Sequence, residues 1–273
     1  MRLGYNWFVE ELYMHKLYII KGTSRGLGNE LAKVLLKSSV NKVIGLSRSA
    51  SQIRDKSFTE IIHDLSRSRL PHIHIESTFS TKYISKFDSI TLVNNAGIIE
   101  PIKSISESSL RQIEDAININ LRSLIYLSRL FIKHTQNLKC KKIICNMTSG
   151  AADRPCAGIT MYNTTKAAAE MFTRSIALEQ VDQEYPVTVV GFRPGRVRTS
   201  LMDKAINASE KDFPNTITFR KNKENNEILE PSLVAKTLVD LLNNQELESG
   251  HIYHIRQLLG IREPFNLDDH LIS

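Results

Sequence analysis

A glycine-rich turn between an apolar run and an amphipathic segment is the feature that most constrains the fold. Residues 17–20 (Leu-Tyr-Ile-Ile) predict a buried strand, and residues 22–28 (Gly-Thr-Ser-Arg-Gly-Leu-Gly) follow at once. Residues 29–36 then carry apolar side chains at helical spacing. Glycines permit a tight turn in which main-chain N–H groups approach a pyrophosphate, and the helix N-terminus adds a favourable dipole. The segment therefore predicts a dinucleotide-binding turn, with an ordinary glycine-rich β–α turn as the alternative.

The next predicted strand, residues 42–48, ends in a basic residue. An acidic residue here would bind the ribose hydroxyls of NAD, whereas a base suits the additional phosphate of NADP. Arg48 occupies this selecting position, and Arg25 in the glycine turn is expected to bind the same phosphate from the other side. The pair predicts NADP(H) as the cofactor, and two solvated arginines are the alternative.

A tyrosine and a lysine one helical turn apart form the second chemical signal. Tyr162 and Lys166 are four residues apart and so share a helix face. A nearby ammonium favours the phenolate, so we expect Lys166 to lower the pKa of Tyr162 and to make it a proton donor near neutral pH. Ser149 follows a strand-like run, residues 141–147, and a hydroxyl there points into the ligand crevice of an α/β sheet. A solvated helix face is the alternative explanation of the Tyr–Lys pair alone.

Taken together, these motifs resemble the short-chain dehydrogenase/reductase family in order and spacing, from residue 17 to about residue 254. The matching residues are Gly22-x-x-x-Gly26-x-Gly28, Asp64-Leu65, Asn94-Asn95-Ala96-Gly97, Asn120, Ser149, Tyr162-x-x-x-Lys166 and Pro194-Gly195 with Thr199. The alternation of strand-like and helical runs independently favours a doubly wound parallel sheet. The expected fold is α/β, a single Rossmann-type domain.

The resemblance implies four catalytic residues. Tyr162 would protonate the substrate carbonyl, Lys166 would lower the pKa of Tyr162 and hold the nicotinamide ribose, and Ser149 would orient the carbonyl. Asn120 would hold a water molecule of the proton relay. The implied cofactor-binding residues are Gly22, Ser24, Arg25, Gly26, Leu27, Gly28, Arg48, Asp64, Leu65, Asn95, Ala96, Gly97, Tyr162, Lys166, Pro194, Gly195, Val197 and Thr199.

Two residues depart from the family pattern. Lys21 stands where the family usually has a threonine that ties the turn together, and Ser123 replaces a glycine often found after the Asn120 position. The lysine either loosens the turn or reaches a cofactor phosphate. Neither departure removes one of the four predicted catalytic residues, so activity is expected.

Composition limits the other functional classes. The net charge of +7 at pH 7 would suit an anionic partner, but no basic block or RNA-binding motif concentrates it, so no nucleic-acid partner is expected. The three cysteines form no C-x-x-C pair and no histidine-spaced cluster, which predicts reduced thiols and no metal site. Neither a secretory apolar core nor a membrane-spanning segment is found, so we expect a cytoplasmic protein.

The chain divides into a short extension and one large unit. Residues 1–13 precede the usual family start, either because Met14 is the initiator or because residues 7–13 form an appended helix. Residues 14–273 form the predicted NADP(H)-binding domain, completed by a helix over 232–242 and a strand over 251–255. Helices over 110–135 and 161–181 carry wide apolar arcs through which family members pair, so a homo-oligomer, a dimer or tetramer, is expected.

The segment 200–230 is polar and irregular and follows Thr199, where the family places its substrate lid. Met202, Phe213 and Phe219 either cap an apolar substrate or anchor the loop to the core. No basic residue of the lid is assigned to a substrate anion, although the sequence places three nearby, namely Lys204, Lys211 and Arg220.

The sequence predicts an NADPH-dependent carbonyl reductase acting on a small molecule. The glycine turn and compact length resemble sepiapterin reductases and the benzil reductases of fungi and bacteria, which implies a 1,2-diketone as substrate and a hydroxyketone as product. The alternatives within the family are a 3-oxoacyl reductase and another alcohol or ketone oxidoreductase. The alternative of another class is a non-catalytic NADP(H)-binding sensor or scaffold, against which the four predicted catalytic residues argue.

Overall fold

The computed structural model describes residues 14–64, 66, 76–244 and 246–261. The strands are β1 (Lys16–Lys21), β2 (Asn41–Ser47), β3 (Phe58–Ile62), β4 (Ser89–Asn94), β5 (Lys141–Met147), β6 (Thr188–Arg193) and β7 (Ile252–His254). The helices are α2 (Gly26–Leu35), α4 (Thr81–Ile84), α5 (Leu110–Ile117), α6 (Ser123–Thr135), α7 (Thr160–Glu179), α8 (Ser200–Ile206), α9 (Thr216–Glu224), α10 (Pro231–Asn244) and α11 (Ile255–Leu258). Three short turns are η2 (Ile105–Glu107), the π-helical η3 (Asn118–Arg122) and η4 (Gly150–Ala152). The predicted extension 1–13 and Leu65 lie outside the described residues.

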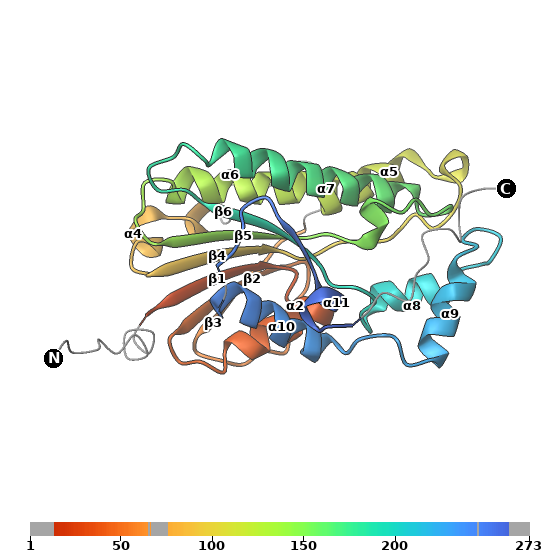
Figure 1. The fold of residues 1–273 in the computed structure, drawn as a ribbon, viewed down its shortest axis with the longest axis horizontal. Helices are drawn as coiled ribbons and strands as arrows, with labels where there is room; N and C mark the ends of the chain where they lie inside the picture. Colours follow the sequence, from red (N-terminus) through yellow and green to blue (C-terminus); the bar gives the residue numbers. More distant parts are fainter. Residues whose placement is uncertain (1–13, 65, 67–75, 245, 262–273) are drawn as a thin grey trace.

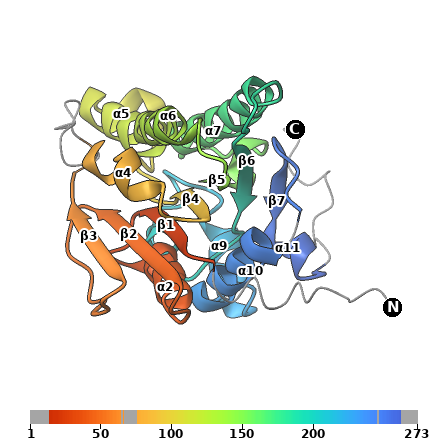
Figure 2. The same ribbon diagram turned by 90° about the vertical axis from the view of Figure 1, so that its left-hand side faces the viewer.

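The described strands form one parallel sheet in the order β3-β2-β1-β4-β5-β6-β7. The chain moves outward from β1 to β3 and then returns to β4, so the strand order reverses between β1 and β4. Helices α4, α5, α6 and α7 cover one face of the sheet, and α2, α10 and α11 cover the other (Figures 1 and 2). The predicted α/β fold with a Rossmann-type doubly wound sheet is confirmed.

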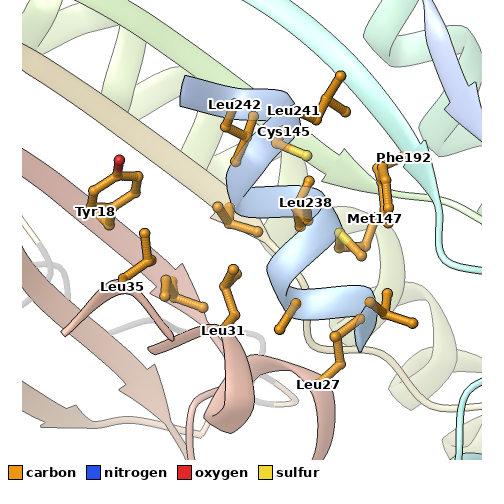
Figure 3. Packing of buried hydrophobic residues seen from close by; sticks show 14 of the residues in the cluster. Tyr18, Leu27, Leu31, Leu35, Cys145, Met147, Phe192, Leu238, Leu241 and Leu242 are labelled. Atoms are coloured by element: carbon orange, nitrogen blue, oxygen red, sulfur yellow. The ribbon is translucent and has the colours of Figure 1, made fainter. Parts of the chain in front are cut away.

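Alternate residues of β1 enter two hydrophobic clusters, one on each face of the sheet. Tyr18 and Ile20 belong to the cluster with α2 and α10, whereas Leu17 and Ile19 belong to the cluster with α6 and α7. Because both faces are covered, the strand is apolar throughout rather than alternating. Figure 3 shows α2 and α10 packed side by side, with α2 near Tyr18 of β1 and α10 near the β5 and β6 residues Cys145, Met147 and Phe192. The labelled leucines of the two helices are Leu27, Leu31, Leu35, Leu238, Leu241 and Leu242.

Two predicted segments differ from the structure. The single helix expected over 110–135 is divided into α5 and α6 by η3. The irregular segment expected over 200–230 contains α8 and α9, which lie beyond the carboxyl ends of the strands (Figure 1). Each of these two helices is short and buries only a few of its residues, so the sequence lacks the repeated apolar spacing that would have predicted a helix. The polar residues that suggested a loop are mostly on their exposed sides.

Candidate active site

A cavity of about 310 Å³ opens at the carboxyl ends of β1 and β4. This is the switch point of the sheet, where open α/β sheets bind ligands. Every predicted cofactor-binding residue of the described chain lines the cavity except Gly28. The segments that form its wall come from β1 and α2, from the loops after β2, β3 and β4, from α7, and from the loop after β6.

The glycine turn after β1 has the close packing that a pyrophosphate cradle requires. Gly22 and Gly26 have φ of 92° and 61°, a region that favours glycine. A Cβ on Gly28 would lie 1.9 Å from the carbonyl oxygen of Gly22, so Gly28 permits α2 to approach the turn rather than lining the cavity itself. The first residues of α2, Gly26 and Leu27, line the cavity. The Arg25 side chain does not cap this helix and its first turn has no acidic residue, so its N-terminal N–H groups and the positive end of its dipole favour a bound anion.

The segment after β4 holds this turn in place. The Asn95 side-chain amide donates to the carbonyl oxygens of Lys21 and Gly22 at 3.3 and 3.2 Å, and the Ala96 N–H donates to Lys21 at 2.8 Å. A Cβ on Gly22 would lie 2.6 Å from that of Ala96. Asn95, Ala96 and Gly97 therefore shape the glycine turn as well as lining the cavity.

Two arginines line the cavity. Arg48 follows β2 and Arg25 precedes α2, and both line the cavity together with Ser47 and Ser49. No carboxylate of the described residues pairs with either guanidinium. Nearby, Asp64 accepts hydrogen bonds from the main-chain N–H and the hydroxyl of Ser66 at 3.0 and 2.8 Å. The cavity wall therefore offers two guanidinium groups to an anion.

Tyr162 and Lys166 lie on α7, one helical turn apart, and both line the cavity. The Lys166 amine is buried, donates to the Met147 carbonyl at 2.8 Å and lies 5.6 Å from the centre of the Tyr162 ring. Ser149 follows β5, accepts a hydrogen bond from the Ala151 N–H at 3.2 Å, and hydrogen-bonds to Tyr162 through its side chain. The structure thus brings together three of the four residues predicted to be catalytic.

Burial controls the protonation of this pair. It raises the pKa of the Tyr162 phenol, and the hydrogen bond with Ser149 opposes this rise. The net direction is therefore opposite to the predicted lowering of the phenol pKa, because desolvation outweighs the groups that favour the phenolate. Burial also lowers the pKa of Lys166 to about 8, a shift that the carboxylate of Glu170 opposes. Tyr162 is consequently protonated at neutral pH, the form that can donate a proton to an oxygen.

Asn120, the fourth predicted catalytic residue, lies in η3 and does not line the cavity. Its side-chain oxygen accepts from the Ile98 N–H at 2.8 Å, and its amide donates to the Ile98 carbonyl at 2.9 Å and to the Thr165 hydroxyl at 3.1 Å. Both amide protons are therefore engaged with protein groups. Asn120 connects η3, the segment after β4 and α7, and its role in holding a water of the proton relay stays a prediction.

The segment after β6 closes the remaining side of the cavity. Pro194, Gly195, Val197 and Thr199 all line it, and Thr199 caps the N-terminus of α8 by accepting from the Met202 N–H. The Thr199 methyl group would lie 3.4 Å from a Cβ on Gly26, so this segment packs close to the glycine turn.

Of the three apolar lid residues, only Met202 lines the cavity. Phe213 is fully buried with Ile99, Ile159 and Ala205, and its ring lies 5.5 Å from that of Phe219. These two rings support the alternative that the lid is anchored to the core. Two of the lid cations are paired, Lys204 with Glu100 and Arg220 with Glu210.

Lys21 does not reach the cofactor turn. It is fully buried, and its amine donates to the Ile119 carbonyl at 2.6 Å. The predicted alternative in which it binds a cofactor phosphate is therefore wrong. In the part of the chain that the structure describes, no group of His, Cys, Asp and Glu could hold a metal ion, and no helix is long and apolar enough to cross a membrane.

Sequence reasoning did not assign several residues of the cavity wall, namely Leu46, Ser47, Ser49, His63, Ser66, Ile98, Ile119, Met147, Thr148, Ser200 and Leu201. Each lies within two residues of a predicted site residue. Closeness in sequence to a predicted site residue was therefore the signal that could have identified these wall residues.

A family profile and two named relatives point to the same protein family. A family profile described as short chain dehydrogenase matches residues 16–211. A Bacillus subtilis (strain 168) protein named benzil reductase ((S)-benzoin forming) is 36% identical over 244 residues, which cover 89% of this chain and 100% of the relative. A Bacillus cereus protein of the same name is 36% identical over 247 residues, covering 87% and 98%.

A solved structure of a Saccharomyces cerevisiae short chain dehydrogenase/reductase shares the fold. Its TM-score is 0.76 at 21% identity, with 91% of this chain and 100% of that chain covered. The family profile and the two Bacillus relatives span most of the sequence, so the predicted resemblance is confirmed. The chain belongs to the short chain dehydrogenase family of oxidoreductases.

Proposed function

We propose that the protein is an NADPH-dependent carbonyl reductase that converts a 1,2-diketone into a hydroxyketone. One observation carries this proposal: Tyr162, with Ser149 and Lys166 beside it, shares a cavity with the glycine turn and with two arginines that no carboxylate of the described residues pairs with. A proton donor and a dinucleotide cradle thus meet at one switch point.

The residues present fit a nicotinamide dinucleotide phosphate. A pyrophosphate suits the turn at Gly22 and Gly26 and the uncapped N-terminus of α2. Arg25 and Arg48 suit the additional phosphate of NADP, because guanidinium groups bind phosphate oxygens through charge-assisted hydrogen bonds. When bound, the reduced cofactor would supply a hydride to the carbonyl carbon.

The residues of the chain account for the proton. The Ser149 hydroxyl would donate a hydrogen bond to the substrate carbonyl and orient it toward Tyr162. The Tyr162 hydroxyl would then donate its proton to the carbonyl oxygen, which is general acid catalysis. The Lys166 ammonium, fixed by Met147, would stabilise the resulting phenolate.

The surroundings of Tyr162 favour an uncharged substrate. Its ring packs against the apolar cluster of Ile99, Ile159, Ala205 and Phe213, which suits a small-molecule pocket with few polar groups. Two of the three lid cations, Lys204 and Arg220, are paired with carboxylates. The names of the two Bacillus relatives agree with a diketone. A 3-oxoacyl thioester on an anionic carrier and a non-catalytic sensor or scaffold are less well supported.

Oxidation of NADPH by the purified protein, followed at the absorbance of the reduced cofactor, tests the proposal across a panel of diketones, quinones and pterins. Benzil is expected to be reduced, with NADPH preferred to NADH. Absence of turnover with every carbonyl of the panel, together with tight NADPH binding, would instead support the sensor.

A further inference from the structure

Lys21 is a buried lysine at the end of β1, one residue before the glycine turn. Strand alternation places it on the same face as Leu17 and Ile19, toward α6 and α7. It is fully buried, although it stands where the family pattern predicts a much smaller threonine. A buried lysine is costly unless its amine is hydrogen-bonded, so its partner indicates what it does.

The partner is the main-chain carbonyl of Ile119 in η3, at 2.6 Å from the Lys21 amine. The Ser123 hydroxyl donates to the same oxygen at 2.8 Å. Lys21 and Ser123 are the two departures from the family pattern, and both bind one atom. A π-helical turn interrupts the regular i→i−4 ladder, and a buried carbonyl left without a donor costs free energy. The two side chains therefore fix this turn at a defined position.

The position of η3 matters because Asn120, the residue after Ile119, is hydrogen-bonded to Ile98 of the cavity wall. The Asn120 side chain forms two hydrogen bonds with the main chain of Ile98 and one with the hydroxyl of Thr165, which is adjacent to Lys166 on α7. Space here is tight: a Cβ on Gly97 would lie 3.2 Å from the Asn120 oxygen and 3.6 Å from the Lys166 amine. A shift of η3 would therefore be transmitted to the wall of the cavity and to α7.

The charge state of Lys21 is compatible with such a contact. Burial and the nearby charge of Lys166 hold the pKa of Lys21 well below its usual range. The amine donates a hydrogen bond to the carbonyl in either protonation state.

We infer that Lys21 is a positioning residue for the reductase reaction, acting with Ser123 through the Ile119 carbonyl to hold Asn120 and thereby the cavity wall beside Lys166. Lys21 touches neither the proposed substrate position nor the proposed cofactor turn with its amine. This inference rests on the proposed function, because its main consequence is a change of kcat.

Lys21→Met removes the donor and keeps the length of the side chain, and Lys142→Met is a matched control. Lys142 is also buried and also donates to main-chain carbonyls, those of Gln136, Leu138 and Tyr185, but it lies at the amino end of β5, away from the cavity. Both variants are expected to lower the unfolding midpoint. Only Lys21→Met is expected to lower kcat with benzil, by about tenfold or more, with the KM for NADPH within about twofold of wild type.

Ser123→Ala is the milder variant if Lys21→Met fails to fold. Because both side chains donate to one oxygen, the double variant should lose more kcat than the product of the two single effects. Hydrogen exchange of residues 117–123, measured by mass spectrometry, should accelerate in Lys21→Met and not in Lys142→Met.

The inference is overturned if Lys21→Met keeps kcat within about twofold of wild type, or if exchange of residues 117–123 is unchanged. It is also overturned if kcat and NADPH affinity fall together, because the glycine turn itself would then have collapsed. Failure of the wild-type protein to reduce any diketone would refute the proposed function instead, and hydrogen exchange would still decide whether Lys21 holds η3.

Discussion

The amine of Lys166 lies 5.6 Å from the centre of the Tyr162 ring and donates to the Met147 carbonyl at 2.8 Å. Met147, the last residue of β5, thus fixes the amine beside the ring, and Ser149 follows Met147 by two residues. The helix α7 and the end of β5 together set the geometry of Tyr162 and Lys166. This contact argues against the alternative in which the two residues lie on a solvated helix face.

Tyr162→Phe removes the phenol and keeps the ring. General acid catalysis typically contributes ~10²–10⁴-fold, so kcat for diketone reduction should fall by about this factor. NADPH binding, followed by quenching or transfer of the nicotinamide fluorescence, should change little because the glycine turn and the arginines remain. A variant that kept more than about a tenth of wild-type kcat would show that another group donates the proton.

The pH dependence should follow Lys166, whose pKa burial lowers to about 8. Below this pH the amine carries the charge that stabilises the phenolate, and above it the charge is lost. The value of kcat/KM for reduction should therefore be level below about pH 8 and fall at higher pH, approaching about tenfold per unit. Lys166→Arg keeps a charge that does not titrate in this range, so its kcat/KM should be lower than that of the wild type but should not fall at higher pH. A wild-type profile that stays level to pH 10 would contradict the assignment.

The parts of the site that depend on local geometry could be predicted from the sequence. A spacing of four puts Tyr162 and Lys166 on one helix face in any α-helix, and a glycine turn between strand and helix suits a pyrophosphate. The direction of the phenol pKa could not be predicted in this way, because the pKa depends on how much protein surrounds the ring.

The role of Lys21 was also beyond the sequence. Its position on β1 fixes the face on which it lies, but its partner, Ile119, is 98 residues away and belongs to a π-helical turn with no sequence signature. The lid is a similar case, since α8 and α9 are stabilised by packing against the core rather than by their own apolar period.

Cofactor preference should depend on Arg48. Charge-assisted hydrogen bonds contribute ~1.5–3 kcal/mol, so Arg48→Asp should weaken NADPH binding by roughly ten- to a hundred-fold and should narrow the gap to NADH. Lys56→Asp, at a lysine that does not line the cavity, makes a similar change of net charge as a control. An unchanged ratio of kcat/KM for the two cofactors would remove Arg48 from the phosphate site.

Assembly should depend on the outer face of α7. Met171, Leu178 and Val181 are 60%, 74% and 70% exposed along α7 and the turn after it, an unusual apolar stripe for a surface helix. We expect at least a dimer with an isologous contact on this face. Leu178→Glu should shift the mass in light scattering toward the monomer, whereas Ile62→Glu, which changes an exposed apolar residue of β3, should not. A wild-type protein that is monomeric at micromolar concentration would refute the prediction.

The substrate should be a vicinal diketone reduced to one enantiomer of the hydroxyketone. The second carbonyl activates the first, so protonation by Tyr162 and a hydrogen bond from Ser149 suffice without an ionic anchor. Lys204 and Arg220 are paired with carboxylates and are not free to bind an anionic carrier. A bound nicotinamide would supply hydride to one face of the carbonyl that Ser149 and Tyr162 orient, so the product of benzil should be a single enantiomer by chiral chromatography. The competing substrate is an acetoacetyl thioester, and kcat/KM for the two should favour benzil. A clear preference for the thioester, or a racemic hydroxyketone, would exclude the diketone as the substrate for which this site is built.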